Sequence, residues 1–253
     1  MRKDNTLFVG KVVHRFATLP STNQYATDLL AKSTPAEGTV ILADAQSAGK
    51  GQFGSSWESV AGKNLLFSLI LYPRFLRPPD QFLLAQMAAL ALAGSVESLA
   101  PARVRVKWPN DIYIDDRKVA GILIQNQIGP GRIHHSIVGM GLNVNQTEFP
   151  RHLPNPTSLA RATGGAVDRR GLFATLMAVL EHRYLQLQGG QFDRLRTDYH
   201  RWLYGLDEAK TFHLPDGHSF EGSIRGVDLT GKLRVEGKPG GENLYRPKEI
   251  SYR

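Results

Sequence analysis

Residues 49–59 read GKGQFGSSWES and combine closely spaced glycines with a cation, an amide and an indole. Such a loop can bring its backbone N–H groups to a phosphate, while Lys50, Gln52 and Trp57 supply contacts to phosphate and base. It lacks the Gly-Lys-Ser/Thr ending of a P-loop. A strand-like run follows it where a dinucleotide-binding motif would have a helix. Two interpretations remain, a flexible hairpin loop and a lid over a phosphate.

A second block, KWPNDIYIDDRKVAGILI at residues 107–124, predicts a hairpin with charges on one face. If a two-residue turn closes it at the double aspartate, Tyr113 pairs with Lys118 and Asp111 pairs with Ala120. Because side chains alternate along a strand, Asp111, Tyr113 and Lys118 then share one face. A surface ion pair there would contribute about 0–1 kcal/mol. Lys118 adjoins an apolar run that contains a glycine, so we favour an anion-binding lysine.

The elements that must position these blocks alternate between strands and helices. Strands are expected at 11–19, 38–46, 64–72, 103–127 (interrupted by Trp-Pro-Asn-Asp) and 133–145, and helices at about 21–32, 80–100, 168–188 and 191–203. Ser21 and Gln24 have capping-box spacing, and Asp80 and Asp168 are expected to begin helices. The run at 64–72 is apolar on both faces, which predicts a central strand. Ser68 within it is interpreted as a core or face residue.

The composition changes near Gly205, where short strands and turn signals begin. We therefore expect a larger domain at 1–204 and a small β domain, SH3-like in scale, at 205–253. The positive excess of the chain lies in the larger part, which holds 23 bases and 15 acids against eight of each in the smaller part. An anionic small molecule, an acidic protein partner or nucleic acid would each fit that excess.

Cysteine is absent, which removes disulfides, thiolate metal sites and cysteine nucleophiles. No apolar run approaches the length of a membrane span, and the N-terminal residues do not form a signal peptide. A cytoplasmic protein without membrane association is expected.

Five motifs in order along the chain resemble the catalytic domain of biotin–protein ligases. They are STN at 21–23, Gln46, GKGQFGSSWES at 49–59, KWPNDIYIDDRKVAGILI at 107–124 and GMGLNVN at 139–145. The likeness runs from about residue 18 to 203, and residues 205–253 are similar to the small C-terminal domain of the family. It implies an α+β fold, a mixed β-sheet with flanking helices like that of class II synthetases, followed by a small SH3-like barrel. Few residues precede the first strand, so the N-terminal DNA-binding domain of the family's repressors is expected to be absent.

The resemblance implies a two-step ligase that uses ATP and Mg²⁺. Biotin and ATP would give biotinyl-5′-AMP and pyrophosphate. A lysine of the partner protein, the biotin carboxyl carrier domain of acetyl-CoA carboxylase, would then take the biotin. It implies no specific nucleic acid and leaves a homodimer possible. The chemistry agrees, because cations must bring a carboxylate and a triphosphate together and the adenylate must be kept from water.

Carried over by position, the resemblance implies a set of site residues. Those on the biotin side would be Ser21, Thr22, Asn23 and Gln46 at the ureido end, Gly49, Lys50, Gly51 and Gln52 in the loop, and Gly121 and Gly139 where the backbone approaches the ligand. Those on the nucleotide side would be Gln52, Trp57, Asn110 and Asn143. Lys118 would meet the carboxylate and later the phosphate, Lys107 would lie near the phosphates, and Asp111 would orient the incoming amine or a metal. No metal ligand is assigned firmly.

The loop departs from the family pattern, which usually reads Gly-Arg-Gly-Arg-x-Gly-Arg-x-Trp. Lys50, Gln52 and Ser55 stand at the three arginine positions, so one charge is kept and two are lost. We expect weaker retention of the adenylate, unless another base, Lys63 or Arg117, folds in to compensate.

Two alternatives stay open at this point. A lipoate or octanoate ligase of the same fold would need a more apolar slot than Ser-Thr-Asn and Gln46 offer. A non-catalytic nucleic-acid-binding protein would bind with steep salt dependence and release no pyrophosphate. Pyrophosphate release with biotin, lipoate or octanoate separates all three.

Overall fold

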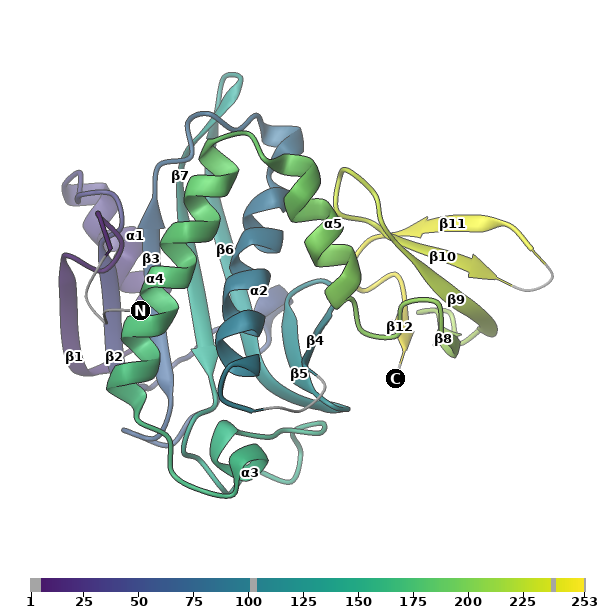
Figure 1. The fold of residues 1–253 in the computed structure, drawn as a ribbon, viewed down its shortest axis with the longest axis horizontal. Helices are drawn as coiled ribbons and strands as arrows, with labels where there is room; N and C mark the ends of the chain where they lie inside the picture. The colour runs from purple at the N-terminus through teal and green to yellow at the C-terminus, as the bar shows by residue number, and fades with distance from the viewer. Residues whose placement is uncertain (1–5, 101–103, 238–239, 253) are drawn as a thin grey trace.

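A computed structural model describes residues 6–100, 104–237 and 240–252, and its main feature is a seven-stranded mixed sheet (Figure 1). The strands lie in the order β1-β2-β3-β7-β6-β5-β4. The first pair is parallel and the others are antiparallel. Their bounds are β1 Val13–Leu19, β2 Val40–Gln46, β3 Leu65–Leu71, β4 Val104–Lys107, β5 Asp111–Ile114, β6 Arg117–Gly129 and β7 Arg132–Leu142. The predicted mixed sheet is confirmed, with the fully buried strand β3 inside it.

Helices cover both faces of this sheet. The bounds are α1 Thr22–Lys32, α2 Phe82–Glu97, α3 Leu159–Thr163, α4 Arg169–Gln188 and α5 Phe192–Trp202, with short 3₁₀ turns η1 Gln52–Gly54 and η2 Pro78–Asp80. Helices α2 and α4 lie together over one face, and α1 packs against β2, β3 and β7 (Figure 1). The predicted α+β class with flanking helices is confirmed.

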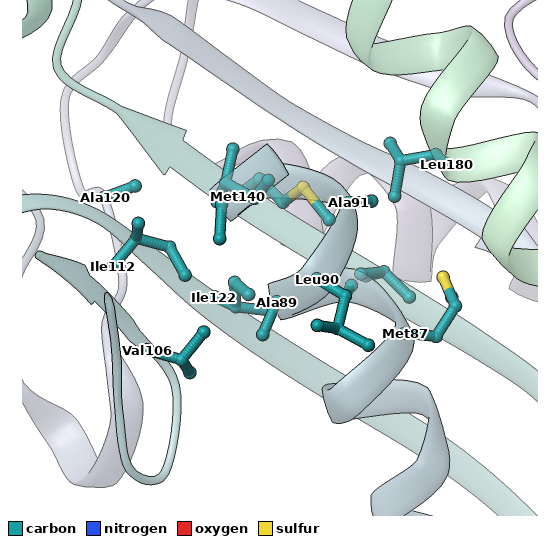
Figure 2. Close-up of a cluster of buried hydrophobic side chains, with 14 of the residues drawn as sticks. Met87, Ala89, Leu90, Ala91, Val106, Ile112, Ala120, Ile122, Met140 and Leu180 are labelled. Atoms are coloured by element: carbon teal, nitrogen blue, oxygen red, sulfur yellow. The ribbon is translucent and has the colours of Figure 1, made fainter. Parts of the chain in front are cut away.

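The alternation of side chains along β3 separates two cores. Leu65, Phe67 and Leu69 belong to the large core under α2 and α4, whereas Ile70 belongs to a smaller core under α1. Figure 2 shows part of the large core, where side chains of α2 meet those of the central strands. Because Ser68 has the parity of Ile70, it faces α1 rather than the large core.

Helix starts were predicted with mixed success. Ser21 caps α1 and accepts a hydrogen bond from Gln24 N, and Asp168 caps α4 in the same way from Arg170 N. The prediction for Asp80 is wrong, because it ends the 3₁₀ turn η2 and Gln81 takes the cap position of α2 without a side-chain cap. The two prolines before it fix φ for a tight turn, which delays the α-helix.

A second, five-stranded antiparallel sheet follows α5. Its strands lie in the order β11-β10-β9-β8-β12. Their bounds, in chain order, are β8 Ala209–His213, β9 Ser219–Val227, β10 Leu233–Gly237, β11 Glu242–Tyr245 and β12 Ser251–Tyr252. The small C-terminal β domain is thereby confirmed, and it packs beside α5 and the β4 end of the large sheet (Figure 1). Within the described parts of the chain, no helix has the length and apolar character to cross a membrane.

Candidate active site

A cavity of about 410 Å³ opens on the α1 side of the large sheet, a size typical of small-molecule sites. All predicted site residues except Gly49 and Asn143 line it. The residues that line it and were predicted are Ser21, Thr22, Asn23, Gln46, Lys50, Gly51, Gln52, Trp57, Lys107, Asn110, Asp111, Lys118, Gly121 and Gly139. Segments more than a hundred residues apart in the sequence therefore meet at one place.

Glycines on the central strands form the floor of this cavity. Gly121 of β6 pairs with Gly141 of β7, and Gly139 of β7 pairs with Leu123 of β6. A side chain at Gly139 would collide with Asn23, and one at Gly141 would collide with the indole of Trp57. Glycine at these positions lets other groups lie directly against the strand backbone, as the Trp57 indole does here.

A wall of hydroxyls and amides closes the α1 end of the cavity. Gln46 Oε1 accepts hydrogen bonds from Thr22 N at 2.7 Å and Thr22 Oγ1 at 3.1 Å. Ser68 Oγ lies 2.8 Å from Thr22 Oγ1 and 2.6 Å from Asn23 Oδ1. Asn23 Nδ2 donates to Gln125 Oε1 at 3.0 Å. Because Thr22, Asn23 and Ser68 are buried, this wall offers fixed donors and acceptors to a polar ligand group.

An ion pair stands at the other side of the floor. Lys118 Nζ lies 2.8 Å from Asp111 Oδ1, with 31% and 22% of the two side chains exposed. Burial raises the pKa of the Asp111 carboxyl, and the charge of Lys118 works against that rise. Lys118 Nζ also lies 5.7 Å from the ring centroid of Trp57. A half-buried ammonium beside a glycine floor is suited to hold a carboxylate or a phosphate.

The hairpin that carries this pair differs in one detail from its predicted register. Tyr113 faces Lys118 as predicted, but Asp111 faces Gly121 rather than Ala120. A bulge between Ile112 and Tyr113 shifts the pairing by one residue. A bulge re-aims the side chains next to it, and here it sets Asp111 beside the floor glycine.

Lys107 lies in a cage that the small domain completes. Its Nζ donates to the backbone carbonyl of Tyr252 at 2.9 Å. The same Nζ lies 5.1, 5.5 and 5.0 Å from the ring centroids of Tyr113, Tyr204 and Tyr252. Such contacts stabilise an ammonium without neutralising it, and they hold the Lys107 side chain at the lining of the cavity.

The glycine loop folds over the cavity as a short β-turn structure. Trp57 N donates to the Gly49 carbonyl at 2.9 Å, and Gly51 N donates to the Ser55 carbonyl at 2.7 Å. The indole of Trp57 lies over the floor glycines, and its Nε1 is buried without a hydrogen-bond partner. At the tip, Phe53 has a φ of 54° and is 56% exposed. We call residues 49–57 the lid.

Two predicted residues lie outside the cavity. Gly49 packs against the Trp57 carbonyl at the base of the lid, on its other side. Asn143 directly follows β7 and is buried, and its Nδ2 donates to the Thr157 carbonyl at 3.0 Å. This bond ties two segments together, while the Asn143 Oδ1 is buried without a hydrogen-bond partner.

The lining residues offer little to a resident metal ion. Asp111 is the single acidic residue among the described residues that line the cavity, and it pairs with Lys118. In the part of the chain that the structure describes, no group of three or more His, Cys, Asp or Glu could hold an ion. Mg²⁺ is commonly held by one or two carboxylates together with substrate phosphates. The site therefore fits a Mg²⁺ that arrives with a triphosphate.

Comparison with known proteins places this geometry in a family. The model of the Biotin/lipoate A/B protein ligase family matches residues 15–143, about half of the chain. The chain belongs to this family. It is 33% identical over 231 residues to the bifunctional ligase/repressor BirA of Bacillus spizizenii. The matched residues cover 90% of this chain and 70% of that protein. The biotin--[acetyl-CoA-carboxylase] ligase of Mycobacterium tuberculosis is 28% identical over 243 residues, 92% of this chain and 88% of that protein.

The fold is that of solved biotin protein ligases. The chain resembles the structure of the Aquifex aeolicus ligase in complex with biotin and ATP with a TM-score of 0.78 and 24% identity. The match covers 96% of this chain and 99% of that one. The likeness includes the small C-terminal domain, because nearly the whole chain is matched.

Several functional candidates in this member of the Biotin/lipoate A/B protein ligase family were missed from the sequence. Ser68, interpreted as a core or face residue and given no role in the site, is the centre of the polar wall, and Gln125 supports Asn23. Parity along β3 could have found Ser68, because it lies on the face opposite Phe67. Lys248 and Tyr252 line the cavity from the small domain, and no local pattern in the sequence reveals a contact between domains.

Proposed function

We propose that this protein is an ATP-dependent biotin–protein ligase. It forms biotinyl-5′-AMP from biotin and ATP and then transfers the biotin to a lysine of the biotin carboxyl carrier domain of acetyl-CoA carboxylase. The proposal is supported by relatives named as such ligases and by the likeness to a ligase structure that contains biotin and ATP. We further propose that the chain has two domains, at 1–204 and 205–253. We also propose a cytoplasmic location, which the absence of cysteine supports.

The observation that carries the biotin assignment is the polarity of the cavity from end to end. Biotin has a ureido ring with two N–H donors and a carbonyl acceptor at one end and a carboxylate at the other. The wall of Thr22, Asn23 and Gln46 presents hydroxyl and amide groups at one end, and Lys118 presents an ammonium at the other. Between them, the glycines of the floor would let the bicyclic ring and the chain of biotin lie close to the strand backbone.

In the first half-reaction, an oxygen of the biotin carboxylate attacks the α-phosphorus of ATP and pyrophosphate leaves. Lys118 holds the carboxylate, and Lys107, kept charged in its tyrosine cage, faces the phosphates. Both cations offset the repulsion between the two anions. Asp111 fixes the Lys118 ammonium at 2.8 Å. A Mg²⁺ ion bound to the triphosphate would neutralise further charge on the leaving pyrophosphate.

In the second half-reaction, the amine of the acceptor lysine attacks the acyl carbon of the mixed anhydride. The bond to the phosphate oxygen breaks, and AMP leaves with the electron pair. Asp111 is the acidic group nearest to Lys118 at this end of the floor, and we assign it the role of orienting the incoming amine. The lid excludes water between the two steps, because the anhydride would otherwise hydrolyse.

The rival function within the family is the activation of lipoate or octanoate. Those acids lack a ureido group and would leave the donors and acceptors of the wall unpaired, which costs about 1–3 kcal/mol per buried group. The test is pyrophosphate release from ATP with biotin, lipoate or octanoate as the second substrate. We expect release with biotin. Release with lipoate or octanoate but not with biotin would overturn the proposal.

A further inference from the structure

A lysine of the small domain reaches the tip of the lid. Lys248 Nζ donates to the backbone carbonyl of Phe53 at 3.2 Å, across 195 positions of sequence. It also lies 4.9 Å from the centroid of the Phe53 ring. Lys248 lines the same cavity as Lys107 and Lys118. The small domain thus contributes a cation to the phosphate side of the cavity and holds the lid with it.

The backbone at Lys248 is unusual for a residue with a side chain. Glu249 N donates to the Arg246 carbonyl at 3.1 Å, which closes a four-residue turn with Pro247 and Lys248 at its centre. Lys248 has a φ of 72°. Proline followed by a positive φ is the pattern of a type II turn, whose third position favours glycine because a side chain is strained there. Strained residues of this kind cluster at ligand clamps and switch regions, which motivates a functional explanation.

The lid's own groups do not replace this contact. Lys50, the cation within the lid, donates to Gln24 Oε1 at 3.1 Å on α1. Ser55 Oγ donates to the Gln52 carbonyl at 2.8 Å, inside the lid itself. Neither Lys63 nor Arg117, the bases that the sequence suggested as substitutes, lines the cavity. Lys248 therefore joins the lid tip to the small domain.

We propose that Lys248 is a positioning residue that keeps the lid closed over the acyl-adenylate between the two half-reactions. It acts through Phe53, and its charge faces the same space as the phosphate. This inference rests on the proposed function, because it needs an adenylate to retain. Loss of the side chain opens the lid more often, so the adenylate escapes and hydrolyses while the chemistry of its formation continues.

The test uses Lys248→Gly in the full chain, because glycine fits the positive φ and removes only the side chain. Wild-type enzyme with biotin and ATP, without acceptor, should give one rapid burst of pyrophosphate and then slow release limited by escape of the adenylate. In Lys248→Gly the burst should remain and the slow phase should accelerate about fivefold, the factor that corresponds to one hydrogen bond of ordinary net strength. Lys248→Arg should restore much of the retention.

Two controls separate the possible results. Lys63→Ala removes an exposed lysine near the lid that does not line the cavity, and its slow phase should match wild type. The melting temperature of Lys248→Gly should equal or exceed that of wild type, because the strain is relieved. An unchanged slow phase in Lys248→Gly, whether or not its melting temperature changes, overturns this inference but leaves the ligase proposal intact. Absence of any burst in wild type with biotin overturns the ligase proposal itself.

Discussion

The wall and the lid, which bound the same cavity, are built in opposite ways. In the wall, Thr22 and Asn23 of α1 and Ser68 of β3 are buried and bonded to one another, and Thr22 also bonds to the half-buried Gln46 of β2. The lid is held by backbone hydrogen bonds within it, by its own Lys50 and by Lys248 of the small domain. Phe53 at its tip is exposed. A preorganised wall loses little entropy when a ligand binds, whereas a lid must open in every cycle. The contrast indicates that the wall selects the substrate and the lid controls how long the intermediate stays.

The largest effect is expected between the two regions, at Lys118. Lys118→Ala should lower pyrophosphate release with biotin about a hundredfold or more, because two charged contacts of about 1.5–3 kcal/mol each are lost. Lys118→Arg should also fail, since a planar guanidinium does not replace a compact ammonium. Arg117→Ala is the matched control and should retain activity. Arg117 directly precedes Lys118 on β6, and its side chain is exposed. Pyrophosphate release near the wild-type rate from Lys118→Ala would show that Lys118 does not take part in the first half-reaction.

Within the wall, we expect Ser68→Ala to raise the KM for biotin about tenfold with little change in kcat. The substitution leaves the buried acceptor Asn23 Oδ1 without its donor and removes the contact to Thr22 Oγ1, and one unpaired buried group costs about 1–3 kcal/mol. Steady-state kinetics over a range of biotin concentrations measure it. Ser136→Ala is the control, because Ser136 is an equally buried strand serine that donates to Asn126 instead. Equal KM values for the two variants would contradict the role of the wall.

Within the lid, Gln52→Arg should slow the escape of the adenylate about fivefold, the difference between a charged and a neutral hydrogen bond. Enzyme loaded with labelled biotin and ATP is chased with an unlabelled adenylate analogue, and release of label is followed. KM for biotin should stay close to that of wild type, because Gln52 takes no part in the wall. Unchanged release from a wild-type enzyme that already retains its intermediate would mean that the lid needs no further charge.

The smallest effect concerns pH. Burial raises the pKa of Asp111, so its carboxylate takes up a proton at a higher pH than an exposed aspartate and Lys118 then loses its charged partner. Activity should therefore fall as pH decreases, by half where Asp111 is half protonated. Asp111→Asn should be less active at neutral pH and should lack this acidic limb. An identical acidic limb in the variant would assign it to another group.

The sequence predicted the wall and the ion pair better than it predicted their surroundings. Alternation along two short strands was enough to put Asp111 and Lys118 on one face, because a hairpin is a local structure. The bulge that sets Asp111 opposite Gly121 was not predicted, since it depends on the sheet around it. Ser68 was predicted only as a core or face residue, because one serine in an apolar strand does not indicate a ligand site until the two faces are distinguished.

Contacts from the small domain were not predictable from any pattern. Lys107 donates to Tyr252, and the lid tip accepts from Lys248, across separations of 145 and 195 residues. Such contacts depend on how two domains pack, and neither charge nor periodicity near Lys248 indicates its partner. A lysine after proline, in a turn that favours glycine, was the nearest signal.

The two-step account is tested most directly by a single turnover in stages. Enzyme is loaded with labelled biotin and ATP, freed of both by rapid gel filtration, and mixed with a biotin carboxyl carrier domain without ATP. We expect the label to elute with the enzyme from the gel filtration column. It should then move to the carrier domain without added ATP and be found on one lysine. An enzyme that retains no label, or that labels the carrier only when ATP is added again, would contradict it.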